Sequence, residues 1–341
     1  MRADMGESRR DTAIDTSGAV PLFQLFPERL EDLSPHTQDP IGQYRKASSP
    51  RYKRAAYHFL RPALDLSVRR YLGRDFLRQV PNLVRVLPER GLPLEDRRNW
   101  INRQCPLRDK RILLLGAGNG WEVLSWARYK PARLVALDLY PFFESWRLVQ
   151  AESMNSRLGA PDFLLASLDE LPVASESMDL AVSDAVFEHC KDMAAVLREL
   201  HRVLRPGGFI YATYGPMWFC FGGDHFSGRG GLTHGYSHIE LSAGAYKDYF
   251  EAQKKPEEDA QSGGRYVELD LFSKLTTGQY FQLYEQQGFR PVETILEISA
   301  NAIEFRKRWP ERFNKLVRSY PGTSPEDLLV KANFVILEKR R

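Results

Sequence analysis

Cysteine and long apolar runs are scarce in this sequence. Its 341 residues include three cysteines, and Cys105, Cys190 and Cys220 lack the paired spacing of a disulfide framework or a zinc motif. This pattern excludes a disulfide-stapled scaffold and predicts reduced thiols. No stretch approaches the roughly 18–20 apolar residues of a membrane span, and the first residues lack the apolar core of a secretory signal. We therefore expect a cytoplasmic protein.

Charge is nearly balanced overall but unevenly distributed. The net charge is +4, whereas the segment from Ile41 to Arg111 alone carries 18 Lys or Arg against six Asp or Glu. Such asymmetry can mark a surface for an anionic partner, such as a phosphate, an acidic carrier protein, nucleic acid or a lipid headgroup. A solvated, Arg-rich helical face explains it equally simply.

The chain divides into three parts by composition. Residues 1–40 are polar and without periodicity, which predicts a disordered or draped leader. Residues 41–104 place apolar side chains at helical spacing, from Tyr57 and Leu60 through Leu83 and Val84, and predict a helical N-terminal cap. Residues 105–341 form the main domain, with insertions expected at about 215–270 and 299–325.

Within the main domain, short apolar runs alternate with helical patterns, which is typical of a doubly wound parallel sheet in an α/β fold. Strands are expected at 112–115, 134–137, 163–166, 180–183, 209–213, 292–298 and 332–337. Helices are expected at 121–128, 143–157, 192–204 and 277–287, with a charged helical insertion at about 301–318.

A glycine turn follows the first of these strands. Gly116, Gly118 and Gly120 let a ligand lie against the backbone, and the next helix start favours a polar or anionic group. A dinucleotide site prefers a later third glycine, and Trp121 occupies that position here. Asp138 ends the second strand about 20 residues on. There it either accepts hydrogen bonds from ribose hydroxyls or caps the helix that follows.

Four further motifs follow in order. They are Ser167–Pro172, Ser177–Ser183, Phe187-Glu188-His189 and Leu200–Gly208. Together with the glycine turn, they resemble the small-molecule, type 11 family of class I S-adenosylmethionine-dependent methyltransferases, typified by the ubiquinone and menaquinone enzymes. The resemblance covers about residues 105–215, with a weaker match at 271–298.

The resemblance implies a fold, a cofactor and a set of binding residues. The fold is a Rossmann-like seven-stranded sheet whose last strand is antiparallel, and the cofactor is S-adenosyl-L-methionine. The residues expected to hold it are Gly116, Gly118 and Gly120 at the methionine, Asp138 at the ribose, Ser167 and Leu168 at the adenine, and Asp184 near the methyl group. Two positions depart from the family pattern: Leu114 replaces the usual acidic residue, and Ser167 stands where Asp is common.

Candidate catalytic residues lie in the aromatic, glycine-rich segment 214–226 after the fifth strand. His225 is the first candidate for a general base, oriented by Asp224 or another carboxylate. His189, which lies outside this segment and follows the fourth strand, is the second. A structural role for His225 is the competing interpretation. A metal site built from His225, His234, His238 and Asp224 is a third, disfavoured because Gly235 interrupts the helix that such spacing needs. We therefore predict no metal.

The resemblance implies methyl transfer, and we expect O- or C-methylation of a small organic acceptor. The clustered aromatic residues after the fifth strand suggest that this acceptor is hydrophobic or carries a ring. The alternatives are an anionic or carrier-bound acceptor (RNA, an acyl carrier or a lipid) and a non-methylating protein on the same fold. The chain lacks the Asn/Asp-Pro-Pro-Tyr/Phe motif that holds planar amines, and it lacks a Pro-Cys nucleophile. Nucleic acid is therefore not the expected partner.

Overall fold

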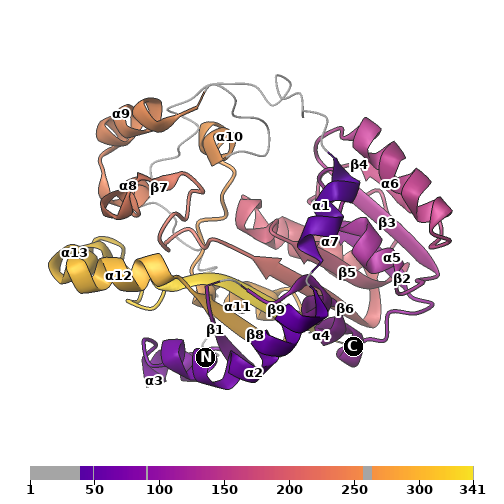
Figure 1. Cartoon of the computed structure of the whole chain (residues 1–341), viewed down its shortest axis with the longest axis horizontal. Helices are drawn as coiled ribbons and strands as arrows, with labels where there is room; N and C mark the ends of the chain where they lie inside the picture. Colours follow the sequence, from indigo (N-terminus) through magenta and orange to yellow (C-terminus); the bar gives the residue numbers. More distant parts are fainter. Residues whose placement is uncertain (1–38, 49, 90, 256–262, 341) are drawn as a thin grey trace, which may run out of the picture.

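The computed structural model describes residues 39–48, 50–89, 91–255 and 263–340. The leader predicted for residues 1–40 therefore lies almost wholly outside the described residues. The centre of the molecule is an eight-stranded sheet in the order β1-β8-β9-β6-β5-β2-β3-β4 (Figure 1). Its strands are β1 (Leu83–Pro88), β2 (Arg111–Leu115), β3 (Arg133–Asp138), β4 (Asp162–Leu165), β5 (Met178–Asp184), β6 (Leu204–Tyr214), β8 (Phe289–Ile298) and β9 (Val330–Lys339).

The pairing confirms the predicted fold class. The last strand, β9, runs antiparallel to both β6 and β8, and the other neighbouring strands are parallel. Seven of the strands reproduce the Rossmann-like sheet expected from the resemblance. The eighth, β1, extends it at the edge beside β8.

Strand β1 corrects the prediction for residues 83 and 84, which had been assigned to an apolar helical face. The preceding helix, α3 (Arg74–Gln79), ends just before Pro81, and Asn82 then adopts a left-handed backbone with φ 47°. Both features stop a helix. The following run Leu83–Pro88 then pairs with the exposed edge of β8. The rest of the N-terminal segment is helical: α1 (Pro40–Ala47), α2 (Arg51–Arg69) and α4 (Leu94–Gln104).

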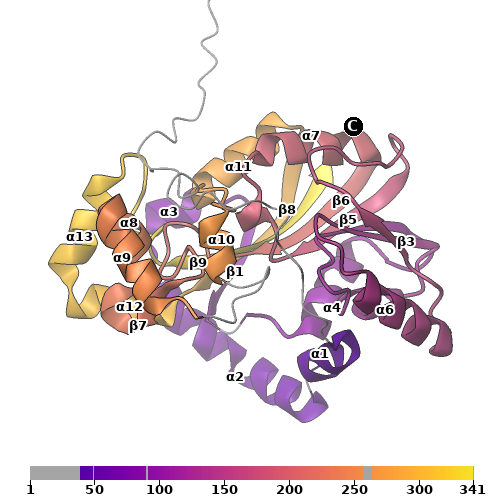
Figure 2. The same cartoon turned by 90° about the horizontal axis from the view of Figure 1, so that it is seen from above.

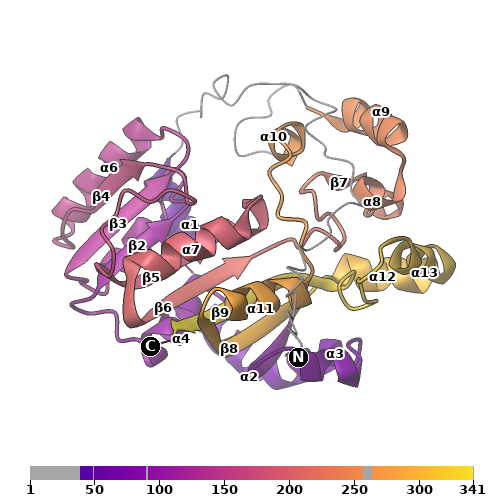
Figure 3. The same cartoon turned by 180° about the vertical axis from the view of Figure 1, so that it is seen from behind.

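Helices cover both faces of the sheet. Those that follow the strands of the main domain are α5 (Val123–Ala127), α6 (Phe143–Asn155), α7 (Met193–Val203) and α11 (Thr277–Gln286), all close to their predicted ranges. Seen from behind, α7 and α11 lie over one face (Figure 3). Alternate residues of β2 follow this layering, because Leu113 and Leu115 enter one apolar cluster and Ile112 and Leu114 enter the other.

The insertion after β6 forms a separate group of short elements. It contains β7 (Ser227–Gly230), η4 (Leu232–His234), α8 (Ser237–Glu240), α9 (Ala243–Gln253) and α10 (Gly263–Glu268). The charged insertion before β9 consists of two helices, α12 (Ala300–Arg308) and α13 (Pro310–Ser319). These elements gather away from α6 and β4, whereas α1 lies at the same end of the molecule as α6 (Figure 2).

Candidate functional site

A cavity of about 350 Å³ opens at the carboxyl ends of the parallel strands. Crevices at this edge are the usual ligand sites of open α/β sheets, and the volume is within the range of small-molecule pockets. Its lining includes Gly116, Gly118, Asp138, Ser167, Leu168 and His189. Six residues singled out from the sequence therefore border one space.

The glycine turn reaches the cavity only with its first two glycines. Gly116 has φ 65°, and a Cβ built there would lie 2.3 Å from a methyl group of Val186, so no other residue fits without movement. Gly118 is held from outside the cavity, because Trp146 Nε1 donates a hydrogen bond of 2.7 Å to its carbonyl. Gly120 is not part of the lining: it packs against Phe163 in the core.

Asp138 supports the turn as well as the cavity. Its carboxylate accepts hydrogen bonds from the backbone N–H groups of Gly118 at 2.7 Å and Tyr140 at 2.9 Å. The second contact closes an Asx-type turn and does not cap α6, whose N-cap residue is Phe142 and has no side-chain cap hydrogen bond. Burial raises the pKa of Asp138 above its usual value, and the backbone hydrogen bonds offset only part of that effect. Contact of Asp138 with a ribose remains a prediction.

The predicted adenine residues follow β4. Ala166 N donates to the carbonyl of Asp138 at 2.9 Å, which brings the start of this segment to the end of β3. Ser167 and Leu168 then line the cavity, together with the exposed Asp169. The apolar side chain of Leu168 and the polar side chain of Ser167 provide the two kinds of contact that a purine requires.

Asp184 is committed to a buried ion-pair network. Its carboxylate accepts hydrogen bonds from Arg97 at 2.8 Å, Arg98 at 2.6 Å, Thr213 at 2.6 Å and Tyr211 at 3.0 Å. Burial alone would raise the pKa of Asp184, but the two arginines outweigh it and hold the pKa below its usual value. Asp184 does not line the cavity, unlike its neighbours Ala185 and Val186. The paired arginines were not recognised in the sequence, although two adjacent cations before the apolar Trp100-Ile101 are unusual in a helix that must pack.

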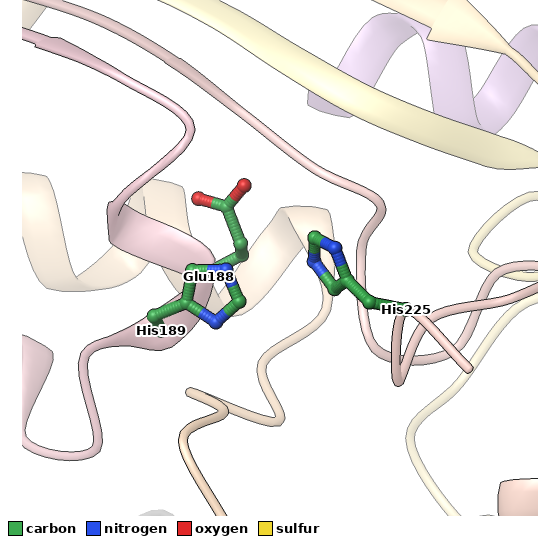
Figure 4. A group of neighbouring side chains, drawn as sticks. All are labelled: Glu188, His189 and His225. Atoms are coloured by element: carbon green, nitrogen blue, oxygen red, sulfur yellow. The ribbon is translucent and has the colours of Figure 1, made fainter. Parts of the chain in front are cut away.

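The two candidate bases come together. His189 ends η3 (Phe187–His189), directly after β5, and its ring centre lies 4.7 Å from that of His225 in the loop after β6 (Figure 4). Burial lowers the pKa of His189 to about 4 and that of His225 well below its usual value. Both imidazoles are therefore neutral at neutral pH. Glu188 lies beside them, and its Oε1 accepts a hydrogen bond from Gly215 N at 2.9 Å.

Asp224 does not orient His225, contrary to the first candidate assignment. Its fully buried carboxylate accepts hydrogen bonds from Ser227 N at 2.7 Å, Ser227 Oγ at 2.9 Å and Phe226 N at 3.1 Å, and also from the hydroxyl of Tyr246. These contacts close the loop locally, as an Asx-type turn does. The carboxylate near His225 is that of Glu188. Glu188 belongs to the Glu-His motif noted in the sequence, but the motif did not indicate this position beside His225.

The metal group considered from the sequence is not assembled. Both ring nitrogens of His238 have protein partners, Ser227 Oγ at 3.0 Å and the Trp218 carbonyl at 2.7 Å. His234 is exposed and stacks on Tyr249 with ring centres 5.3 Å apart. The aromatic residues expected to line an acceptor pocket are instead mostly core: Trp218, Phe226 and Tyr236 are buried.

A second cavity, of about 340 Å³, shares Ala185 with the first as a lining residue. It is bordered by Gly215, whose N–H donates to Glu188, and by Arg97 and Lys331. Lys331 also pairs with Glu89 at 2.6 Å. Both cations already have acidic partners, Asp184 for Arg97 and Glu89 for Lys331, and the carboxylate of Glu297 lines the same cavity.

Comparison with known proteins supports the family resemblance. Residues 113–212 match a family described as a methyltransferase domain. Similar curated proteins include malonyl-[acyl-carrier protein] O-methyltransferases of Laribacter hongkongensis (34% identical over 137 residues, 38% of this chain and 46% of that protein) and Serratia marcescens (34% over 101 residues, 30% and 36%). The chain thus spans less than half the length of these relatives.

Among solved structures, a putative sarcosine dimethylglycine methyltransferase from Galdieria sulphuraria is similar, with 17% identity, a TM-score of 0.46, and coverage of 72% of this chain and 85% of that one. In the described part of the chain, no helix has the length and apolar character needed to cross a membrane.

Proposed function

We propose that this chain, whose residues 113–212 match a methyltransferase domain family, transfers a methyl group from S-adenosyl-L-methionine to an organic acceptor. One observation carries the proposal. The glycine turn, the carboxylate after β3 and the residues after β4 line a single cavity of about 350 Å³ at the ligand-binding edge of the sheet.

The cofactor would lie along this lining. Its methionine part would contact the backbone of Gly116 and Gly118, its ribose Asp138, and its adenine Ser167 and Leu168. Leu114 is buried in the core and offers no carboxylate for the methionine ammonium. Asp184 does not replace it, because four donors already occupy its carboxylate. A backbone carbonyl of the turn would therefore accept from the ammonium group.

Methyl transfer is a displacement at a sulfonium. A lone pair of the acceptor attacks the methyl carbon, the carbon–sulfur bond breaks, and its electron pair leaves a neutral thioether. The protein must align the partners and exclude water. We assign His189 and His225 to the reacting end, since His189 lines the cofactor cavity and His225 packs against it. Asp224 has no part in this assignment.

The acceptor that the chain suits best carries an ionised oxygen. The two cavities share Ala185 in their linings, and the second is bordered by Arg97 and Lys331. A carboxylate placed there would contact two cations that also pair with Asp184 and Glu89. A carboxylate is already ionised at neutral pH and requires no base. Part of this chain is similar to malonyl-[acyl-carrier protein] O-methyltransferases, and this similarity supports an acyl acceptor with a free carboxylate.

Delivery on an acyl carrier is supported by the basic segment 41–111. Helix α2 exposes Lys53 and Arg69, and the exposed Arg70 directly follows it. The helix also exposes large apolar side chains, among which Tyr52 is 71% and Phe59 is 85% exposed. Acidic carrier proteins match such a surface by charge. Free small acids remain the simpler acceptor class, and the two are separated by experiment.

The test begins with calorimetric titration of the full chain with S-adenosylmethionine and S-adenosylhomocysteine. Micromolar binding is expected for the wild type and a loss of at least tenfold for Asp138→Ala, while circular dichroism reports whether the variant is folded. No binding to folded wild-type protein would overturn the proposal. Binding without methyl transfer to any acid tested would favour the non-methylating alternative.

The acceptor is then tested with labelled methyl transfer to malonyl groups on an acyl carrier protein and on a small thioester. If the carrier docks on the basic segment, its turnover falls steeply with salt and in Lys53→Glu/Arg69→Glu, because the contact is electrostatic. The small thioester serves as the control, since its turnover is expected to change little. Equal salt responses would assign the acceptor to the free small-molecule class.

A further inference from the structure

Glu188, His189 and His225 bring three metal-ligating side chains to one point. Their donor atoms all lie within 4.8 Å of one another, and the side chains converge from η3 and from the loop after β6 (Figure 4). Neither element alone provides the group. It forms because the carboxyl end of β5 and the loop leaving β6 meet at the same edge of the sheet.

Two of these donors are buried and lack partners in the described residues. Glu188 is 2% exposed, and its Oε2 receives no hydrogen bond, although Oε1 accepts from Gly215 N. His225 Nε2 likewise has no partner. Buried polar atoms are paired in the great majority of cases, so two unpaired atoms in one cluster of side chains require an explanation. No cation of the described residues forms an ion pair with Glu188.

The third donor is prepared by its other nitrogen. His189 Nδ1 lies 2.8 Å from the carbonyl of Leu271, so Nδ1 carries the proton and Nε2 presents its lone pair. Metal-binding histidines are usually held in this way by a backbone carbonyl or carboxylate. The backbone at His225 is also unusual, with φ 59° in a non-glycine residue. Such positions are uncommon and concentrate at functional sites.

We propose that Glu188, His189 and His225 bind one divalent transition-metal ion of the zinc class through Glu188 Oε2, His189 Nε2 and His225 Nε2. Two imidazoles and one carboxylate form a ligand set of catalytic zinc sites, which leave a fourth position open. Donors around tetrahedral zinc lie about 3.3 Å apart, given bonds of about 2.0 Å, so only a modest closing of the side chains is needed. A dication also compensates the buried carboxylate.

The three side chains lie beside the linings of both cavities. His189 lines the cofactor cavity, and Gly215, hydrogen-bonded to Glu188, lines the second. The ion would there hold an acceptor oxygen as a Lewis acid and orient it toward the methyl group. This role rests on the proposed function, whereas the metal site itself does not.

Binding is tested on the full chain after dialysis against a chelator. Zn²⁺ is titrated calorimetrically, metal content is measured by elemental analysis, and Co²⁺ serves as a spectroscopic probe of coordination. We expect one equivalent in the wild type, with visible Co²⁺ absorption typical of low coordination. Affinity should fall at least 100-fold in Glu188→Gln and in His225→Asn.

The matched control is His234→Gln, which removes an exposed histidine of the same insertion and should keep wild-type metal affinity. Because a buried substitution can unfold the chain, each variant is also titrated with S-adenosylmethionine, and retained cofactor binding identifies a folded protein. Failure of the wild type to bind Zn²⁺ or Co²⁺, or equal binding by folded Glu188→Gln, overturns the metal site. If the wild type binds the cofactor but no metal, the metal site is wrong and the proposed methyl transfer stands. If it binds metal but no cofactor, the metal site stands and the proposed methyl transfer is wrong.

Discussion

Arg98 Nη1 donates a 2.6 Å hydrogen bond to Oδ2 of Asp184, and the two side chains are 1% and 4% exposed. The guanidinium also lies 3.9 Å from the ring centre of Trp126. This pair joins α4, which precedes the methyltransferase segment, to the carboxyl end of β5. The N-terminal segment is therefore joined to the sheet close to the candidate site by an almost fully buried ion pair.

Arg98→Met should lower the free energy of unfolding by about 3–5 kcal/mol, because it leaves the Asp184 carboxylate buried with one of its two cations removed. Arg133→Met is the control. It breaks an ion pair with Asp162 whose side chains are 61% and 51% exposed, and exposed pairs contribute at most about 1 kcal/mol. Urea unfolding measures both. Similar losses in the two variants would contradict the structural role assigned to Arg98.

Glu122 predicts a pH dependence of stability. Burial, with the charge of Asp184 added, raises the pKa of Glu122 from its usual 4.5 to about 8, even though Arg98 lies 3.5 Å away. Arg98 lies closer to Asp184 than to Glu122, so it stabilises the ionised form of Asp184 more than that of Glu122. Above about pH 4.5 the unfolded side chain has lost its proton and the folded one retains it. Stability should therefore fall as pH rises from about 4.5 to 8.

Glu122→Gln keeps the side chain neutral at every pH and should remove this decline. Between pH 5 and 8.5 the wild type should lose on the order of a few kcal/mol more than the variant, since one pKa unit corresponds to about 1.4 kcal/mol. Denaturant unfolding at the two pH values measures the difference, with the exposed Glu170→Gln as reference. Parallel curves for wild type and Glu122→Gln would show that Glu122 is ionised in the folded protein.

Much of the sheet could be predicted because its strands are buried on both faces and read as short apolar runs. Residues 112–115 and 180–183 are examples, and both are strands within a few residues. Strand β1 could not be predicted, because Leu83 and Val84 continue a helical spacing and only their pairing with β8 favours the extended form. The spacing of apolar residues within this segment carries no information about a strand about 200 residues later in the chain.

The lining of the first cavity was also more predictable than the arrangement of the candidate bases. Glycines after a strand and Asp138 at a strand end occupy positions that the chain order alone defines. Asp224 and His225 lie in a loop, where orientation depends on tertiary contacts. The Asp-His sequence suggested that they act together, but Asp224 turns to Ser227 and His225 turns to Glu188 and His189. Neighbours in the sequence were not neighbours in the site.

Gly116→Ala should abolish measurable cofactor binding or weaken it at least tenfold, because its Cβ would lie 2.3 Å from Val186 in the cavity wall. Gly159→Ala separates this clash from backbone strain. Gly159 also has a positive φ, 85°, but no atom lies within 4 Å of its Cβ position. Its substitution should cost about 1–2 kcal/mol of stability and leave cofactor affinity unchanged. Calorimetry and thermal unfolding measure the two effects, and equal affinities in the two variants would argue against the cavity as the cofactor site.

Trp146 positions the glycine turn without lining the cavity. Its indole N–H donates to the Gly118 carbonyl at 2.7 Å, while its ring stacks on Phe163 with centres 5.0 Å apart. Trp146→Phe keeps an aromatic ring against Phe163 and removes the hydrogen bond, which contributes about 1 kcal/mol. Cofactor affinity should fall about fivefold.

Trp126→Phe is the matched control, because the Trp126 Nε1 has no partner in the described residues. It should change stability through packing but leave the affinity as it is. If both variants lost affinity equally, the effect would belong to general loosening of the domain, and the hydrogen bond to Gly118 would have no specific role.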